Sequence, residues 1–229
     1  SVVLNNTLLT GTGGNPNLKP ITANNIDASL AWYISPRSYV SAGVFSQDFK
    51  NYVKTGTGLV ELINIDTGLP AIYTVTSRSG KNAKLKGLEL AAEMPLFGGF
   101  GVLGNVTYVD AKDENDLPML GASDVTYNVR AYYEDKKFSA SLAYNHRSEY
   151  AYVFQGNGTN TPGNGARYFA AAGSLSASIG YRVTDKISVH LDANNLNNPV
   201  RYTYHIDKNA PAAFYENGRQ YFATLRVKF

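Results

Sequence analysis

Histidine and carboxylate side chains are the groups in this sequence with the clearest capacity for acid–base or metal chemistry. His146, His190 and His205 share none of the short spacings that metal ligands need. The acidic run at 110–116 lacks the alternate acidic positions and the glycine of an EF-hand loop. Its default interpretation is a solvated loop, with a weak Ca²⁺ site as the alternative. Cysteine is absent, which excludes thiol chemistry. We therefore expect no catalytic residues, no metal and no cofactor.

Aromatic and amide residues are better candidates for a function, because they could hold a solute without reacting with it. Sugar rings stack on aromatic side chains and bond to amides, and ferric siderophores also bind aromatic groups and arginine. Packing within the loops is the alternative role for each residue. One group of candidates comprises Tyr150, Tyr152, Phe154, Gln155, Asn157, Arg167, Tyr168 and Phe169, and a second comprises Tyr202, Tyr204, His205, Phe214 and Tyr215.

The composition restricts the kind of scaffold that presents these residues. The 229 residues include 17 Tyr and 10 Phe but only 17% charged residues, which is unusual for a soluble domain. Mean hydropathy is nevertheless −0.24, and no apolar run of about 18 residues predicts a membrane helix. The net charge of +3 is scattered, so we expect no nucleic-acid partner. These facts agree if apolar and polar residues are interleaved along strands.

Many segments show this interleaving with a period of two residues, as a strand with one apolar and one polar face requires. In the segment 168–182, for example, the serines alternate with larger apolar residues. The polar set is mostly small, which suits a wet or filled lumen better than a packed core. The alternation also runs to the end of the chain, at Tyr221, Ala223, Leu225, Val227 and Phe229.

Short and long connections alternate along the chain, as in a meander with tight turns at one rim and long loops at the other. The short turns are at 35–37, 95–98, 134–136 and 183–186, and the long loops are near 10–21, 55–70, 111–121, 151–167 and 206–217. The expected strands lie near 1–10, 22–35, 38–54, 71–94, 99–110, 121–134, 137–150, 168–182, 187–205 and 218–229.

Aromatic residues gather at both ends of these strands, as in the girdles of a membrane barrel. Near the short turns they are Trp32, Tyr33, Tyr39, Phe97, Phe100, Tyr132, Tyr133, Phe138, Tyr181 and Phe229. The sequence therefore predicts an all-β fold, a transmembrane antiparallel up-and-down β-barrel.

Three stretches resemble the C-terminal barrel of TonB-dependent outer-membrane receptors. They are 14–20 (GNPNLKP), 86–90 (KGLEL) and 189–198 (VHLDANNLNN), the last followed by Gly218, Arg219 and Phe229. Ile21 departs from the family pattern, which usually has Glu after LKP. The resemblance implies that residues 1–229 are about the last ten strands of a 22-strand barrel. It also implies an N-terminal plug, first strands and a TonB-contacting box that are absent from this sequence.

The resemblance further implies a function, partners and a location in the cell outer membrane. The expected function is active uptake of a large scarce solute, an oligosaccharide or a ferric siderophore, without enzymatic activity. The expected partners are outer-membrane lipid and lipopolysaccharide, the TonB inner-membrane energising complex and the small-molecule solute. Independently of the resemblance, Lys81, Lys84 and Lys86 could meet lipopolysaccharide phosphates, with a role in solubility as the alternative. The barrel assembly machinery is expected to read the terminal aromatic strand as an assembly signal. The alternatives are a complete small barrel acting as a passive pore or an outer-membrane enzyme, and a soluble β-sandwich.

Overall fold

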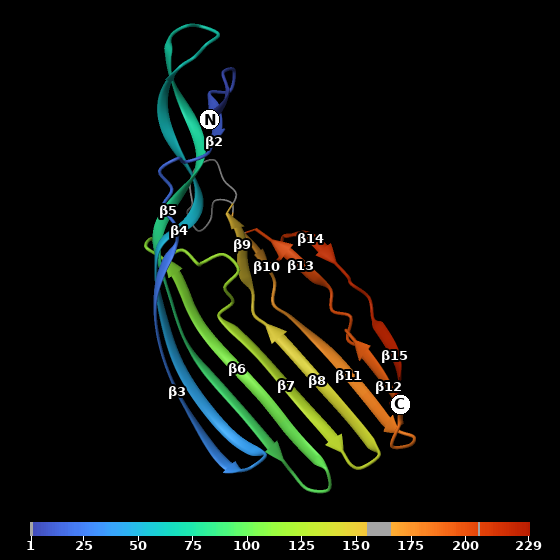
Figure 1. Cartoon of the computed structure of the whole chain (residues 1–229). Helices are drawn as coiled ribbons and strands as arrows, with labels where there is room; N and C mark the ends of the chain where they lie inside the picture. Colours follow the sequence, from blue (N-terminus) through green and yellow to red (C-terminus); the bar gives the residue numbers. More distant parts are fainter. Residues whose placement is uncertain (1, 155–165, 206) are drawn as a thin grey trace.

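The computed structural model describes residues 2–154, 166–205 and 207–229, and the regular elements within them are all strands (Figure 1). They are β1 (Val2–Asn5), β2 (Thr10–Gly13), β3 (Thr22–Ser35), β4 (Ser38–Ile63), β5 (Pro70–Pro95), β6 (Phe100–Asp113), β7 (Val125–Glu134), β8 (Phe138–Arg147), β9 (Tyr150–Phe154), β10 (Ala166–Phe169), β11 (Ala172–Arg182), β12 (Ile187–Asn194), β13 (Arg201–Tyr204), β14 (Pro211–Tyr215) and β15 (Gln220–Val227). The expected all-β fold is confirmed.

Nine of these strands form a curved antiparallel wall in the order β3-β4-β5-β6-β7-β8-β11-β12-β15. Consecutive strands of the wall pair with each other. In the chain, β9 and β10 come between β8 and β11, and β13 and β14 come between β12 and β15, but these four strands are not part of the wall (Figure 1). This is the expected up-and-down meander. Within the described residues the sheet is open, with β3 and β15 at its two edges.

The pairing register places most of the apolar residues of the nine strands on one side of the wall, because directly opposite residues in antiparallel strands point the same way. We name this side the apolar face. One row across it consists of Met94, Val102, Ala131, Leu142, Ala177, Ala193 and Tyr221. A second row reaches the other edge through Trp32, Val40, Ala92, Gly104, Val129, Tyr144 and Leu175.

Large side chains on the apolar face are left uncovered by the protein. Leu30 is 77% exposed, Leu142 is 50% exposed and Ile179 is 48% exposed. A water-soluble monomer rarely exposes an apolar patch of more than a few hundred Å². An apolar band of this extent is the surface that a transmembrane β-barrel turns toward lipid.

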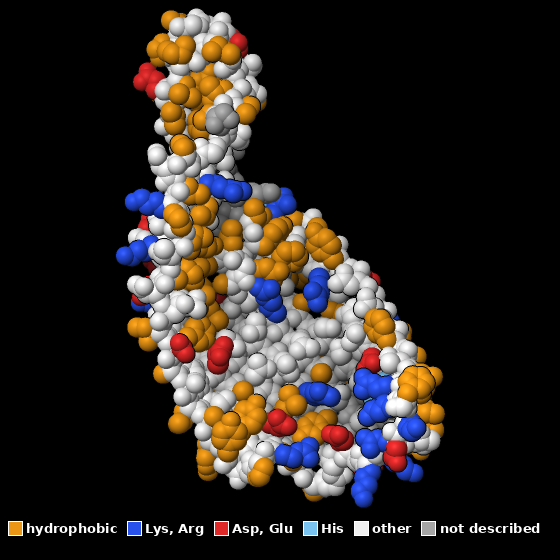
Figure 2. All heavy atoms as spheres, in the orientation of Figure 1, with side chains coloured by type: hydrophobic (Ala, Val, Ile, Leu, Met, Phe, Trp, Pro, Cys, Tyr) orange, Lys and Arg blue, Asp and Glu red, His pale blue; other side chains and the backbone are white. Residues whose placement is uncertain are grey.

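The opposite side of the wall, the polar face, carries small and hydrophilic side chains. One of its rows consists of Ala91, Asn105, Asn128, Asn145 and Ser174. Figure 2 shows the hollow side of the wall, where uncharged polar side chains and backbone cover the middle and charged side chains lie around it. The wall therefore has the two-sided character that the period of two predicted.

The short turns end the wall at one rim, and an aromatic band follows that rim on the apolar face. Ring centroids of Phe97 and Phe100 are 6.3 Å apart, those of Phe100 and Tyr133 are 4.8 Å apart, and those of Tyr133 and Phe138 are 5.9 Å apart. Gly98 and Gly99 form the turn with φ of +62° and +89°, a backbone conformation that favours glycine.

Three residues of the expected short-turn girdle are placed differently. Tyr33 and Tyr39 are opposite each other in the register row of Glu93, and Tyr132 is opposite Ser141. All three belong to the polar face, so they are not part of the aromatic band. Proximity to a turn did not reveal the face, because the face depends on the parity of each position within its strand.

The long connections contain more strand than the sequence predicted. The segment 55–70 was expected to be a loop, but β4 and β5 run through most of it as a long hairpin that projects from the wall (Figure 1). The segment 1–10 is not a wall strand. It contributes to a small β1–β2 hairpin, and β2 pairs in parallel with the outer half of β5. Backbone pairing between distant segments decides these points.

The predicted strands 168–182 and 187–205 are each divided in two. β10 is separate from β11, and β13 is separate from β12. The outer pieces join parts of the expected loops 151–167 and 206–217 in a second sheet of order β14-β13-β10-β9. This outer sheet stands at the rim opposite the short turns (Figure 1).

Candidate solute-binding surface

The outer sheet brings the two predicted groups of aromatic residues together. Tyr168 lies opposite Tyr204, and Phe169 lies opposite Thr203 on β13 and Tyr150 on β9. These groups are more than 30 residues apart in the sequence, so only the pairing of β10 with β13 makes them neighbours. The result is an aromatic surface above the wall that covers both faces of the outer sheet, because Tyr168 and Phe169 are successive residues and point to opposite faces.

Ring contacts connect most of the described candidates. The Phe169 ring centroid lies 5.3 Å from that of Tyr150, 4.6 Å from that of Tyr152 and 6.3 Å from that of Tyr215. Tyr168 stacks on Tyr204 with centroids 5.4 Å apart. The centroids of Tyr202 and Phe214 are 6.1 Å apart. Such pairs stabilise a sheet by about 0.5–1.5 kcal/mol each beyond the area that they bury.

Exposure divides this surface into residues that a solute could reach and residues that support them. Phe214 is 64% exposed and Tyr215 is 47% exposed, whereas Tyr204 is only 3% exposed. Tyr204 is thus a supporting residue. Phe214 and Tyr215 are adjacent in the edge strand β14, so their side chains point to opposite faces of the outer sheet. We name this exposed pair the aromatic ledge.

A carboxylate below the aromatic surface fixes Tyr204. Its hydroxyl donates a hydrogen bond of 2.8 Å to Glu149 Oε2, and Lys208 Nζ lies 2.6 Å from the same oxygen. Burial and the hydrogen bond to Glu149 raise the pKa of the Tyr204 hydroxyl far above its usual range. Burial and the Glu149 charge also raise the pKa of Tyr168. Both phenols are therefore neutral at physiological pH.

Arginines lie at the margins of the surface. The guanidinium carbon of Arg147 is 3.7 Å from the ring centroid of Tyr150, a cation–π contact. Arg147 Nε also donates to Ser123 Oγ at 2.6 Å. Arg167 Nε donates to His205 Nε2 at 3.2 Å, so this nitrogen of His205 acts as an acceptor. These contacts hold both cations beside aromatic rings.

Sequence reasoning missed three residues of this arrangement, namely Arg147, Glu149 and Lys208. The available signal in the sequence was that Arg147 and Glu149 lie just before the aromatic run that begins at Tyr150. Their partners could not be inferred, because Glu149 and Tyr204 are 55 positions apart. Of the predicted residues, Gln155 and Asn157 lie outside the described residues. Phe154 is the last residue of β9.

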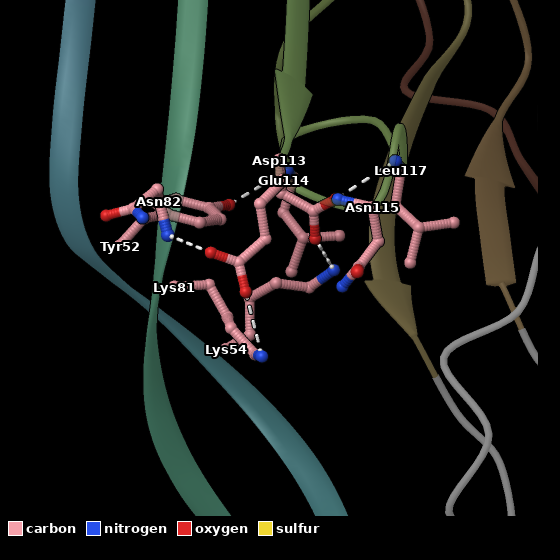
Figure 3. Close-up of polar contacts among 9 residues, drawn as sticks. Tyr52, Lys54, Lys81, Asn82, Asp113, Glu114, Asn115 and Leu117 are labelled. Atoms are coloured by element: carbon pink, nitrogen blue, oxygen red, sulfur yellow. Dashed lines mark hydrogen bonds and ion pairs between the residues drawn. The ribbon is translucent and has the colours of Figure 1, made fainter.

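A second polar cluster lies where the outer end of β6 meets the middle of β4 and β5 (Figure 3). Lys54 Nζ is 2.5 Å from Asp113 Oδ2, and their side chains are 5% and 1% exposed. Asp113 Oδ1 accepts hydrogen bonds from the backbone N–H groups of Asn115 and Leu117, at 2.9 and 3.0 Å. Burial acts to raise the pKa of Asp113, but the bonds from Lys54 and the two amides outweigh it and hold this pKa below its usual value.

Hydrogen bonds and an ion pair around Asp113 attach the following loop to β5. Glu114 Oε1 lies 2.9 Å from Lys81 Nζ, and Glu114 Oε2 accepts a hydrogen bond of 3.1 Å from the Asn82 backbone. The Tyr52 hydroxyl accepts one from the Leu120 backbone at 3.1 Å (Figure 3). The acidic run thus folds the 114–121 loop onto the wall. Within the described part of the chain, no three His, Asp or Glu side chains lie close enough to hold a metal ion.

The geometry defines a class of protein: a membrane-barrel wall with an aromatic surface at its long-loop rim. The family model "TonB dependent receptor-like, beta-barrel" matches residues 3–196. The chain belongs to the TonB-dependent receptor family. A search of the curated proteins found no match. Among residues 2–154, 166–205 and 207–229 there is no helix with the length and apolarity to cross a membrane.

Solved structures of similar fold belong to the same family of receptors. A variant of the ferric enterobactin receptor of Pseudomonas aeruginosa has a TM-score of 0.71 and 16% identity, over 96% of this chain and 33% of that one. A siderophore receptor of Acinetobacter baumannii has a TM-score of 0.66 and 20% identity, over 96% and 33%. The copper transporter OprC has a TM-score of 0.66 and 16% identity, over 93% and 32%. The chain thus spans about a third of the length of these structures.

Proposed function

We propose that this chain forms part of the wall and outer surface of a TonB-dependent outer-membrane transporter that takes up a large, scarce solute. The observation that carries the proposal is the continuous apolar face, which is in register from β3 to β15. It lies below an outer sheet rich in aromatic residues. A wall of this kind needs lipid on one side and a polar lumen on the other.

Closure of the lumen and the input of energy would be carried out by other parts of a longer protein. An N-terminal plug would close the lumen, and a TonB-contacting segment would receive energy from the inner membrane. The barrel assembly machinery would read the last strand with Phe229. No bond-making or bond-breaking step, and no nucleic-acid partner, is assigned to this chain.

The proposed solute is a ferric siderophore or an oligosaccharide that contacts the aromatic ledge. Phe214 and Tyr215 are exposed and lie on the sheet that also carries Arg167. Flat rings beside fixed cations suit a solute with ring systems and partial negative charge. One of the solved structures described above is a siderophore receptor and another is a ferric enterobactin receptor, which supports the siderophore class.

The test uses the full-length protein in outer membranes and measures binding of a ferric catecholate siderophore and of a maltodextrin. The double variant Phe214→Ala/Tyr215→Ala should weaken binding of one probe by roughly 5- to 150-fold, if each ring contributes about 0.5–1.5 kcal/mol. The matched control, Leu59→Ala/Ile65→Ala, removes two apolar side chains that are more exposed than the ledge and lie near the tip of the β4–β5 hairpin. Equal losses in both variants would contradict a role for the aromatic ledge.

A complete small barrel acting as a pore or an enzyme is the weaker alternative. The family match favours the receptor, and the described wall has an unpaired strand edge on each side, which a membrane does not tolerate. The soluble β-sandwich is also disfavoured, because an apolar face runs the full length of many strands.

A further inference from the structure

Lysine and arginine side chains gather around a hollow at the short-turn ends of β8, β11, β12 and β15. The hollow has a volume of about 230 Å³, and six cationic side chains line it against three acidic ones. Its net charge of +3 equals that of the whole chain, so the fold concentrates charges that are scattered along the sequence (Figure 2). We name this space the cationic hollow. Its cations are Lys136, Lys137, Arg182, Lys186, Arg226 and Lys228.

Two arginines flank the middle of the cationic hollow. Arg182 on β11 is opposite Ser188 on β12, and Ser188 is opposite Arg226 on β15. Ser188 alternates with Val189 of the apolar face, so this row belongs to the polar face of the wall. Neighbouring strands lie about 4.8 Å apart, so the two arginine backbones are about 10 Å apart with a small side chain between them. One anion above Ser188 could therefore contact both guanidinium groups.

The row behind the arginines keeps the floor of the hollow open. Gly180 on β11 lies opposite Ser139 on β8 and His190 on β12. A Cβ atom at position 180 would lie 2.5 Å from Ser139 Oγ and 2.7 Å from His190 Nδ1, so no larger residue fits there without displacing them. The floor thus adds hydroxyl and imidazole groups, which can donate hydrogen bonds, to the charges around it.

Carboxylates of the chain leave the cationic hollow uncompensated. None of the ion pairs among residues 2–154, 166–205 and 207–229 includes any of its six cations. Asp135 lines the hollow, but its Oδ1 accepts hydrogen bonds of 2.7 Å from the backbone N–H groups of Lys137 and Phe138, which hold the turn. A hollow lined by an excess of one charge attracts counter-ions and raises their local concentration.

We propose that the cationic hollow is a second binding site of the transporter, which takes an anionic group of the solute at the short-turn end of the lumen. Guanidinium groups bind carboxylates and phosphates through two parallel hydrogen bonds. The volume is below the roughly 300–1,000 Å³ of a site that encloses a whole small ligand, so the hollow suits one part of a larger solute. This inference rests on the proposed function and adds that the solute is an anion.

The two sites lie at opposite rims of the wall. The aromatic ledge belongs to the outer sheet, whereas the cationic hollow adjoins the short turns (Figure 1). A solute taken up from outside would meet the ledge first and the hollow last. The ledge variant should therefore change the first binding step, and a variant of the hollow should change a later one.

The first experiment measures anion binding to the detergent-purified full-length protein by isothermal titration calorimetry. The probes are citrate and tripolyphosphate, with neutral maltotriose as the uncharged comparison. Arg182→Gln/Arg226→Gln removes the flanking charges, and Arg78→Gln/Arg201→Gln is the equal-charge control on β5 and β13. Ser188→Asp keeps both arginines and supplies a carboxylate between them, with Ser176→Asp on the same face of β11 as its control.

We expect the arginine double variant and Ser188→Asp each to bind both anions at least about tenfold more weakly, with wild-type affinity in the two controls. The affinity of the wild type should fall as salt is added. Equal losses in a variant and its control would overturn the site, and so would maltotriose binding as tightly as the anions. A wild type that binds neither anion, as when carboxylates of a longer protein fill the hollow, would also overturn it.

The second experiment follows uptake of a ferric catecholate siderophore, whose catecholate oxygens are anionic, and of a maltodextrin into cells. The arginine double variant should bind the siderophore at the surface like the wild type but take it up at least about fivefold more slowly. Unchanged siderophore uptake, or uptake of maltodextrin alone, would overturn the anionic solute. Loss of binding to the aromatic ledge for neither probe would contradict the proposed function, whereas tripolyphosphate binding would still report on the hollow.

Discussion

Replacing Leu142 with arginine tests the assignment of the two faces most directly. Leu142 is half exposed and lies opposite Ala131 and Ala177 in the middle of an apolar row. It is four residues from Phe138 in the aromatic band and five from Arg147 at the outer end of β8. At about 2.5 Å of vertical rise per tilted residue, Leu142 lies close to the middle of the hydrocarbon layer.

An arginine at this depth on the lipid side costs about 2–4 kcal/mol of folding free energy. A loss of about 3 kcal/mol lowers the folding equilibrium constant more than a hundredfold. The matched control is Ser141→Arg, one residue away. Ser141 lies opposite Tyr132 and Ser178 on the polar face, where we expect a loss of no more than about 1 kcal/mol.

Urea unfolding of both full-length variants in lipid vesicles, followed by heat-modifiable migration on gels, measures the two free energies. If Leu142 faces lipid, Leu142→Arg must lose at least about 1 kcal/mol more folding free energy than Ser141→Arg. Equal losses, or a larger loss for Ser141→Arg, would mean that the apolar face does not contact hydrocarbon.

Three further predictions concern single groups. The folded pKa of Asp113 lies below its usual value of about 4. The stability that this carboxylate contributes is therefore present above about pH 4, and it is lost as the pH falls from there through the lower, folded pKa. Thermal melts between pH 7 and pH 3 should therefore show a smaller acid-induced fall for Asp113→Asn. This variant also removes the buried ion pair of Asp113 with Lys54, so it should lower stability by several kcal/mol at pH 7. Tyr204→Phe removes a hydrogen bond to Glu149 and should cost about 1.5–3 kcal/mol in chemical unfolding at pH 7; because the folded pKa of Tyr204 is raised, the wild type should also lose stability above about pH 10, and an identical alkaline profile for Tyr204→Phe would count against this bond. Deleting Phe229 should lower the amount of full-length protein in the outer membrane, measured by surface labelling, and normal levels would remove its role as an assembly signal.

The face of each strand was predictable because it depends on local parity. The alternation of Ile179 and Tyr181 with serines identified the apolar side of β11 without any knowledge of its partners. The bounds of β3 agree with the predicted 22–35, because a two-residue-period segment there ends at the turn containing Pro36. Membership of the receptor family also followed from short linear motifs.

The alternation of residues did not predict where a strand ends because its pairing partner changes. The predicted strand 168–182 is divided because β10 pairs with β9 and β13, whereas β11 pairs with β8 and β12. The outer half of β4 extends through a segment that was expected to be a loop, because β5 pairs with it as far as Pro70. Hydrogen bonding to a neighbouring strand supports such segments, and the composition of the segment itself does not reveal it.

The order of residues alone was enough to predict a wall of strands with two different faces, because apolar and polar residues alternate with a period of two along each strand. Which distant side chains meet depends on the folded sheet, which brings Lys54 to Asp113 and Glu149 to Tyr204. These contacts depend on the register between strands, and register is a property of the whole sheet.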